Sequence, residues 1–304
     1  MIISASRRTD IPAFYAEWFI RRVKAGYCTV VNPFKNKQVS RISLKPEDID
    51  VVVFWTRNAA PLLPYLFILD EKKIPYYFQY TIIGYPKVLE SRTLKLEEAI
   101  NTFQALSKQI GAERVIWRYD PICITNLTDY DWHRKQFGQI AQALNGKTKR
   151  VVISIVDNYR KAVYNFKQLA KHGIVVQQPN LAEIKSLIQD LVTMADANGM
   201  EIYSCAETLD LGSSALKPGK CIDDVYINEV FGIKVNSQKD KGQRAECGCI
   251  SSKDIGVYDT CLHGCSYCYA GTLTAALKNY PQHDSNSPSL IDFHDVMEPK
   301  INVV

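Results

Sequence analysis

From the first residue to about residue 205, short runs rich in β-branched and aromatic residues alternate with amphipathic helical patterns. Strands and helices that alternate in this way build a parallel sheet with helical crossover connections. Several of the strand runs are apolar on both faces, which is typical of strands covered on both sides. The alternation therefore predicts an α/β fold, and seven such units nearly complete a (β/α) barrel. The predicted strands are Ile2–Ser4, Val51–Trp55, Tyr76–Thr81, Arg114–Tyr119, Val151–Ile155, Ile174–Gln177 and Ile202–Cys205.

Two of the intervening segments show clear helical stripes of apolar residues at three- and four-residue spacing. Asn180, followed by Glu183 three residues later, predicts the start of the second helix. The stripes consist of Leu96, Ile100, Phe103, Leu106 and Ile110, and of Leu181, Ile184, Leu187, Ile188, Leu191 and Val192.

The composition changes after about residue 210, where Lys, Asp, Gly and Ser become frequent between cysteines. We therefore expect a barrel core over residues 1–210 and a cysteine-rich iron–sulfur segment over residues 211–304 that completes the barrel. The 304 residues are 46% hydrophobic and 23% charged, which excludes a disordered or low-complexity chain. The net charge of +5 is too small to indicate a nucleic-acid partner. Without a membrane-length apolar run or an export signal, we expect a cytoplasmic protein with no membrane partner.

Seven of the nine cysteines fall in the last hundred residues, and three of them lie in the sequence DTCLHGCSYCYA. The spacing of Cys261, Cys265 and Cys268 brings three thiolates to one side of a tight turn, which Gly264 eases. Three thiolates on a 4Fe-4S cluster leave one iron without a protein ligand, and such an open position is typical of a catalytic site. The alternative is structural zinc, with His263 or another cysteine as the fourth ligand.

The other six cysteines divide into two groups. Cys28 and Cys123 each stand alone among apolar residues, so we expect them to be buried and without a role at a metal site. Four cysteines are the number that fully ligates a second 4Fe-4S cluster or a zinc ion, although some of the four could be unliganded core thiols. These four are Cys205, Cys221, Cys247 and Cys249.

The C-x3-C-x2-C spacing, with the aromatic Tyr267 directly before the last cysteine, resembles the signature of the radical S-adenosylmethionine (SAM) superfamily. The run from Tyr267 to Ala270 resembles the spore photoproduct lyase branch. FWTRNAAPL, around Trp55 to Asn58, resembles a strand of that branch that ends in a Thr-Lys-Ser turn. VIWRYDPI, from Val115 to Ile122, resembles its Arg-Phe-Asp-Pro-Ile strand end. The whole chain also resembles an uncharacterised bacterial family, a domain of unknown function that begins with SASRRTDIPAF and ends in this cysteine run.

The superfamily resemblance implies that the open iron binds the amino and carboxylate groups of SAM. One-electron reduction would then cleave SAM to methionine and a 5′-deoxyadenosyl radical that abstracts hydrogen from a substrate. An electron donor such as flavodoxin or ferredoxin is implied as a partner. The substrate stays open between a small molecule and a peptide; nucleic acid is possible, but no basic stripe with interleaved aromatic residues indicates it.

Radical SAM proteins carry their cysteine loop after the first barrel strand, whereas here the loop lies close to the C-terminus. A circular permutation would reconcile the two. Residues Ile255 to Tyr258 would then be strand one, residues Ala270 to Leu277 the following helix, and Ile2–Ser4 strand two. The alternative is a separate cysteine-rich module appended to a closed barrel.

Active sites of parallel barrels are built at the carboxyl ends of the strands, and polar residues gather at these positions here. Arginines suit the carboxylate of SAM or an anionic substrate, and carboxylates could accept hydrogen bonds from the amino group or ribose of SAM. Asp10 could instead cap a helix, and Arg118 could pair with Asp120. Trp55 and Trp117 are expected in the core. The candidate cofactor-binding residues are Arg7, Arg8, Asp10, Thr56, Arg57, Gln79, Arg118, Asp120 and Glu207, among other strand-end residues that include Ser4, Ser6, Asn58, Thr81, Ser154, Asp157, Gln177 and Gln178.

The sequence thus predicts a radical SAM-type iron–sulfur enzyme with an unidentified substrate. The alternative from another class is a zinc-stabilised barrel that binds a ligand or partner without redox chemistry. A metal-dependent hydrolase is less favoured, because the strand ends lack the histidine-rich ligand set of such sites.

Overall fold

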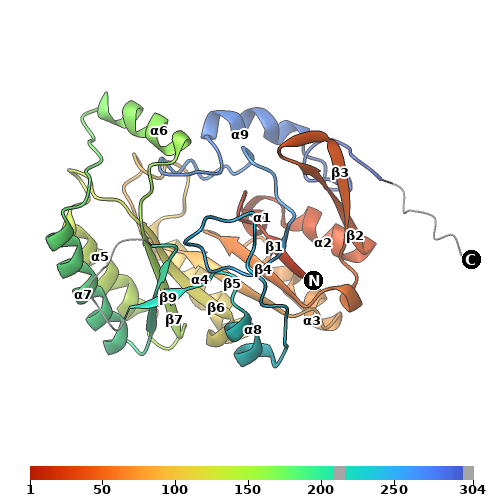
Figure 1. Ribbon diagram of the computed structural model, residues 1–304, viewed down its shortest axis with the longest axis horizontal. Helices are drawn as coiled ribbons and strands as arrows, with labels where there is room; N and C mark the ends of the chain where they lie inside the picture. The colour runs from red at the N-terminus through yellow and green to blue at the C-terminus, as the bar shows by residue number, and fades with distance from the viewer. Residues whose placement is uncertain (208–215, 297–304) are drawn as a thin grey trace, which may run out of the picture.

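The computed structural model describes residues 1–207 and 216–296, and its centre is one eight-stranded sheet (Figure 1). Every hydrogen-bonded neighbour pair in this sheet is parallel, which confirms the predicted α/β class. The strand order is β10-β1-β4-β5-β6-β7-β8-β9. The strands are β1 (Ile2–Ala5), β4 (Val51–Thr56), β5 (Tyr76–Thr81), β6 (Val115–Ile122), β7 (Arg150–Ile155), β8 (Glu201–Cys205), β9 (Lys217–Gly219) and β10 (Lys253–Asp254).

Helices connect most of the strands, and α2, α3, α4, α5 and α7 pack on the outer face of the sheet. The two predicted apolar stripes lie on α4 and α7, and Asn180 caps α7 by accepting hydrogen bonds from the backbone N–H groups of Ala182 and Glu183. The largest apolar cluster packs these helices against residues such as Phe54, Phe78 and Trp117. The helices are α1 (Ile11–Phe14), α2 (Ala16–Ala25), α3 (Leu66–Glu71), α4 (Leu96–Ile110), α5 (Tyr130–Ala143), α6 (Arg160–Ala170), α7 (Leu181–Ala197), α8 (Asp224–Phe231) and α9 (Leu273–Asn279). No helix in these described ranges is both long enough and apolar enough to span a membrane.

The strand that leads into the cysteine loop lies beside the first strand of the chain. β10 pairs with β1 in parallel, with Ser4 opposite Asp254, and Ile255 continues the contact by donating its N–H to the Ser4 carbonyl at 3.0 Å. The strand is two residues earlier than the predicted segment Ile255 to Tyr258. Segments about 250 residues apart in the sequence are therefore direct neighbours in the sheet.

The predicted strand Ile174–Gln177 is wrong. β7 pairs directly with β8, so no strand fits between them. Val176 instead forms an isolated antiparallel bridge with Thr125, in the loop that follows β6. The last position of the sheet belongs to β9, which contains Pro218 and Gly219. These residue types are unfavourable inside a sheet, but an edge strand tolerates them.

The sequence reading also missed a hairpin, β2 (Tyr27–Asn32) and β3 (Lys35–Ser43), which forms a separate antiparallel sheet. In Figure 1 the hairpin stands on the side of the molecule opposite α5 and α7. Residues near the end of the chain hold it there, since Thr29 donates its N–H to the carbonyl of Pro288 at 2.8 Å.

The inner face of the sheet is covered by the cysteine-rich segment. A second apolar cluster joins strand residues such as Val53 and Tyr77 to Ile222 and Ile227 of the segment around α8, together with Ile250. Parallel sheets require cover on both faces. Residues after 216 therefore supply this cover as well as both edge strands.

The buried His133 predicts that stability depends on pH. Its side chain is fully buried on α5, where Nδ1 lies 2.8 Å from the hydroxyl of Tyr119 and Nε2 lies 3.3 Å from the carbonyl of Cys123. A carbonyl only accepts, so Nε2 carries the proton and Nδ1 accepts from the tyrosine. Burial lowers the pKa of His133 to about 4. As the pH falls, the imidazole of the unfolded chain is protonated at a higher pH than the buried one. The stability that the neutral, buried His133 contributes is therefore complete above about pH 6.5 and is lost as the pH falls toward 4.

We expect the free energy of unfolding to fall by roughly 3 kcal/mol from this group between pH 6.5 and 4. Urea unfolding at several pH values measures it. His133→Gln keeps a donor and an acceptor but does not titrate, so its stability should depend less steeply on pH. Identical slopes for the two proteins would contradict this role of His133.

A cysteine-lined candidate active site

A cavity of about 410 Å³ lies at the carboxyl ends of the parallel strands. Residues at the ends of β1, β4, β6, β7 and β8 line it, together with the loops that carry the clustered cysteines. The seven cysteines of the two predicted metal sites all line this cavity, whereas Cys28 and Cys123 are buried elsewhere. The fold therefore brings both predicted cysteine groups to one place. They are Cys205, Cys221, Cys247, Cys249, Cys261, Cys265 and Cys268.

The C-x3-C-x2-C loop is held along one side by the segment that follows β5. Arg92 donates its N–H to the carbonyl of His263 at 3.0 Å, and Ser266 donates its N–H to the carbonyl of Leu89 at 2.9 Å. Gly264, which is predicted to lie in a tight turn, has a φ of +69°, in the left-handed region that favours glycine. A Cβ atom at Gly264 would lie 2.3 Å from Oγ of Ser91, so the Ser91 hydroxyl, which contacts the Gly264 carbonyl, would have to move.

Helix α6 holds the other side of the loop. Nζ of Lys161 forms an ion pair with Asp259 at 2.7 Å. The side-chain amide of Asn165 donates to the carbonyl of Ser266 at 3.0 Å. The loop is thus fixed between two elements that reach it from different strands of the sheet.

A buried charge network lies beneath the loop and joins it to β4. Nη1 of Arg57 lies 2.8 Å from Oε1 of Glu90, and the Glu90 side chain is only 2% exposed. The hydroxyl of Tyr267 accepts a hydrogen bond from Arg57 and donates one to Glu90. The aromatic residue of the cysteine motif is therefore positioned through its hydroxyl as well as its ring.

Asp10 has the capping role that the sequence left as an alternative, and it also lines the cavity. It caps α1 by accepting a hydrogen bond from the N–H of Ala13 at 3.0 Å, and it lines the cavity. Its Oδ2 accepts from the N–H of Arg57 and lies 2.7 Å from Nε2 of His263, both in buried surroundings. Asp10 thus ties the first cysteine-loop residues to the ends of β1 and β4.

The surroundings of the three loop thiols favour the neutral thiol as long as no metal is bound. Burial raises the pKa of Cys265 to about 12, and the nearby Arg57 charge opposes the rise. Burial also raises the pKa of Cys261 and Cys268, while the backbone N–H groups of Ala270 and Gly271 oppose it at Cys268. A bound metal reverses this balance, because coordination favours the thiolate. Fixed donors beside sulfurs that face a cavity are the surroundings that an iron–sulfur cluster uses.

The other four thiols lie near one another in the cavity wall. Sγ of Cys205 is 3.4 Å from Sγ of Cys221, and Cys221, Cys247 and Cys249 lie close enough to influence one another's pKa. The contact with Cys249 lowers the pKa of Cys247 to about 7, so this thiol ionises more readily than a free cysteine. Among the side chains of residues 1–207 and 216–296, no three His, Cys, Asp or Glu are arranged as a ligand set for one metal ion.

Seven of the nine predicted cofactor-binding residues line the cavity, and Gln79 and Glu207 do not. Of the other strand-end residues, Thr81, Ser154 and Asp157 are in the lining, whereas Ser4, Ser6, Asn58, Gln177 and Gln178 are not. Gln79 is fully buried, and its amide donates to the carbonyl of Cys221 at 2.8 Å. The carboxylate of Glu207 accepts from the N–H of Ile155 at 3.3 Å and is not part of the lining. Trp55, predicted as a core residue, lines the cavity under the guanidinium of Arg7, whereas Trp117 is buried as expected. The predicted cofactor-binding residues in the lining are Arg7, Arg8, Asp10, Thr56, Arg57, Arg118 and Asp120.

Arg118 and Asp120 form the pair that the sequence left as an alternative. Nε of Arg118 donates to Oδ2 of Asp120 at 2.9 Å, and its Nη1 also donates to Gln79 and, at 2.9 Å, to Sγ of Cys221. The guanidinium is therefore committed to the protein on several sides.

Sequence reasoning missed Glu90 and Asp254. Asp254 accepts hydrogen bonds from the Ser4 hydroxyl and the Arg7 N–H, which fixes the end of β1 at the cavity. Asp254 could have been found as an acidic residue at the end of a strand adjoining the cysteine loop. Glu90 lies in a segment without any recognisable motif, so no comparable signal was present.

The fold and the site together define an α/β protein with a cysteine-lined cavity at the carboxyl ends of a parallel sheet. Residues 2–270 match the family model named Domain of unknown function (DUF1848), and the chain belongs to this family. The expected membership of an uncharacterised domain family is therefore confirmed. None of the curated proteins compared with the chain matches it.

One solved structure similar to part of the chain is "a putative alpha-L-fucosidase from Bacteroides thetaiotaomicron VPI-5482". The two chains are 13% identical, and the TM-score is 0.28. The match covers 56% of this chain and 66% of the other.

The Arg57–Glu90 pair makes the first prediction about the site. Removing one partner of a buried ion pair leaves the other charge without compensation, which costs about 3–5 kcal/mol. We expect Glu90→Ala to lower the free energy of unfolding of the reduced, metal-free protein by that amount in urea titrations. The matched control is Glu17→Ala, because Glu17 pairs with Arg21 on the exposed surface of α2, where a pair contributes up to about 1 kcal/mol. Equal effects of the two substitutions would contradict the importance of burial at Glu90.

Proposed function

We propose that this protein is a radical SAM-type iron–sulfur enzyme whose first cluster is held by Cys261, Cys265 and Cys268. The observation that carries the proposal is the common position of these thiols. All three line one cavity at the carboxyl ends of parallel strands, which is where the active sites of such folds are built. The three-thiolate set leaves one iron of a cubane without a protein ligand.

We also propose that the sheet is a circularly permuted barrel of the radical SAM type. The pairing of β10 with β1 supports this, since it gives the order strand, cysteine loop, helix α9 and then the neighbouring strand β1. A loop that follows the first barrel strand would occupy the same position in a chain without the permutation. The alternative of a separate appended module does not account for β10 as a strand of the central sheet.

Arg7 is the arginine in the cavity that is best placed to bind the carboxylate of SAM or of a substrate. Its Nη2 donates to Asp240 and Ser252, but its Nη1 is buried without a hydrogen-bond partner in the described parts of the chain. A bound carboxylate would satisfy this donor. Within the same described ranges, Nδ1 of His263 is a second buried atom without a hydrogen-bond partner, and His263 also lines the cavity.

With SAM bound, the iron–sulfur cluster would supply the electron for reductive cleavage of SAM to a 5′-deoxyadenosyl radical. The chain itself would orient the cofactor and substrate and exclude water and oxygen. The fixed cysteine loop, the Asp10–His263 contact and the Arg57–Glu90–Tyr267 network serve orientation, because each joins the loop to a strand end. The substrate, a small molecule or a peptide, would enter the remaining space of the cavity, and an electron donor such as flavodoxin or ferredoxin would supply the electron.

Anaerobic reconstitution followed by iron, sulfide and zinc assays tests this function. We expect about four irons and four sulfides at the first site, and formation of 5′-deoxyadenosine from SAM with a strong reductant. Cys265→Ala should abolish both the iron bound there and the product. The matched control is Cys28→Ala, a buried cysteine outside the cavity, which should retain both. Zinc at the three-cysteine loop, without iron or sulfide, would instead favour a zinc-stabilised binding protein.

The glycine of the loop gives a second prediction. Gly264→Ala introduces a Cβ atom 2.3 Å from Oγ of Ser91 as well as a strained φ, so we expect the loop to shift and iron binding to weaken. Gly146→Ala is the matched control, because Gly146 has a similar φ of +71° but open space around its Cβ position. The control should cost about 1 kcal/mol of stability and leave the iron content unchanged. Full iron retention in Gly264→Ala would show that loop geometry does not determine binding.

A further inference from the structure

We propose that Cys205, Cys221, Cys247 and Cys249 bind a single zinc ion through four thiolates, in the wall of the same cavity. This inference extends the proposed function but does not depend on it. The sequence alone does not decide whether these four cysteines bind a second cluster, bind zinc or remain unliganded. The spacing of the sulfurs favours the single ion.

Two sulfurs of this group, those of Cys205 and Cys221, are too close together to bind different irons of one cubane. In a tetrahedral tetrathiolate site, Zn–S bonds of about 2.3 Å place the sulfurs about 3.8 Å apart. The Cys205 and Cys221 sulfurs are 3.4 Å apart, close to this spacing, and Cys247 and Cys249 line the same cavity. In a cubane each thiolate binds a different iron, so the ligand sulfurs stand much farther from one another.

Among the described residues the sulfurs do not surround one point, and the Cys205 and Cys221 thiols are in hydrogen-bond contact with each other. Zinc binding would replace this contact. Four Zn–S bonds form, four thiol protons are released to solvent, and no electron is transferred. Rotation of cysteine side chains is the adjustment that this requires.

The backbone around the group is fixed by contacts that need no metal. Cys205 of β8 pairs with Gly219 of β9, and a Cβ atom at Gly219 would lie 2.6 Å from the carbonyl oxygen of Ser204. The carbonyl of Cys221 accepts hydrogen bonds from the Tyr77 hydroxyl and from Gln79, each at 2.8 Å. These contacts hold two of the four ligands at the sheet.

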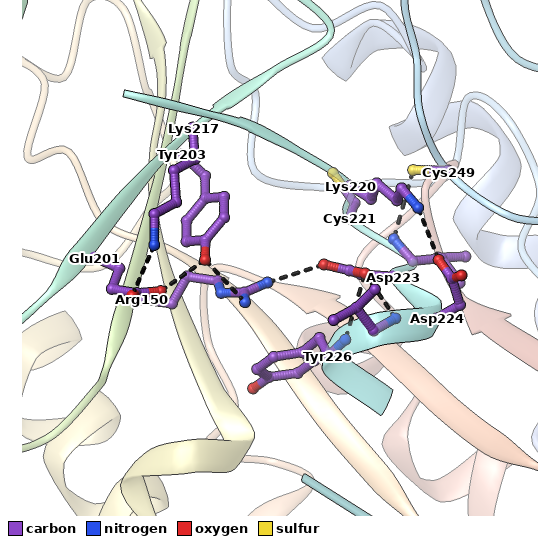
Figure 2. A network of polar contacts seen from close by, with 12 residues as sticks. Arg150, Glu201, Tyr203, Lys217, Lys220, Cys221, Asp223, Asp224, Tyr226 and Cys249 are labelled. Atoms are coloured by element: carbon purple, nitrogen blue, oxygen red, sulfur yellow. Dashed lines mark hydrogen bonds and ion pairs between the residues drawn. The ribbon is translucent and has the colours of Figure 1, made fainter. Parts of the chain in front are cut away.

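A buried ion pair fixes the chain directly after Cys221 (Figure 2). Arg150 of β7 lies 3.1 Å from Asp223, and the rings of Tyr203 and Tyr226 stack on its guanidinium at 4.1 and 4.6 Å. Asp223 also caps α8 by accepting from backbone N–H groups. Figure 2 shows the sulfur of Cys249 near the same turn, where the N–H of Ile222 donates to it at 3.5 Å. A site held in this way loses little conformational freedom on binding.

The surroundings also fit a closed structural site. Donors from Arg118 and from the N–H of Ile222 reach thiols of the group and would offset the charge of four thiolates. Four protein ligands leave no open position, so the ion would not act as a Lewis acid. It would join the end of β8 to the segment that covers the inner face of the sheet.

Metal analysis of the full chain, grown with iron and zinc and purified anaerobically, tests the inference. We expect about one zinc per chain in addition to the iron of the first site. Cys249→Ala should lose the zinc and keep the iron, whereas Cys265→Ala should keep the zinc. Cys123→Ala is the matched control, a buried cysteine outside the cavity, and should keep both metals.

Cobalt(II) gives a second measurement that needs no variant. Titration of the zinc-free protein should produce the strong sulfur-to-cobalt charge-transfer and visible bands of a tetrahedral thiolate site. Twice the iron without zinc would overturn the inference in favour of a second cluster, and loss of titratable thiols without metal would overturn it in favour of a disulfide. Zinc without any iron would leave this inference standing while the proposed enzymatic function fails.

Discussion

The structure depends on how the inner face of the parallel sheet is covered. Helices bury the outer face, but a parallel sheet is stable only when both faces leave water. The cysteine-rich segment supplies the second cover through Ile222, Ile227 and Ile250, which pack on alternate residues of the central strands. This apolar contact is non-directional, but the turns next to it carry Cys221 and Cys249. Hydrophobic burial thus brings to the sheet the chain that holds the metal-binding residue types.

The central strands could be predicted from sequence because each is a run of apolar β-branched and aromatic residues. The predictions for Tyr76–Thr81 and for the helix after Asn180 agree with the structure at the level of residues. Ile174–Gln177 has the same local character, but tertiary pairing of β7 with β8 excludes it from the sheet. Lys217–Gly219 contains Pro and Gly, which are unfavourable in a strand, yet it forms β9 because it lies at the edge of the sheet. Both differences arise from contacts that a local pattern does not contain.

The candidate site shows the same division. The cysteines could be predicted because few roles suit clustered thiols, and the structure brings both groups to one cavity. Gln79 and Arg7 both lie at strand ends, so the sequence did not distinguish their roles. Gln79 donates a hydrogen bond to the carbonyl of Cys221 outside the cavity lining, whereas Arg7 lines the cavity. Glu90 has no sequence signal, since its importance comes from burial against Arg57. Side-chain roles that depend on a distant partner require the three-dimensional structure.

The pairing of β10 with β1 has a consequence for biosynthesis. Ser4 cannot pair with Asp254 until about 250 further residues have been synthesised. Contacts across such a separation form slowly, because a long loop must be closed before they contribute. The cavity therefore assembles late, when nearly all of the described chain is available. During most of translation the cysteine loop does not yet exist, so a growing chain would present no finished site to metal or oxygen.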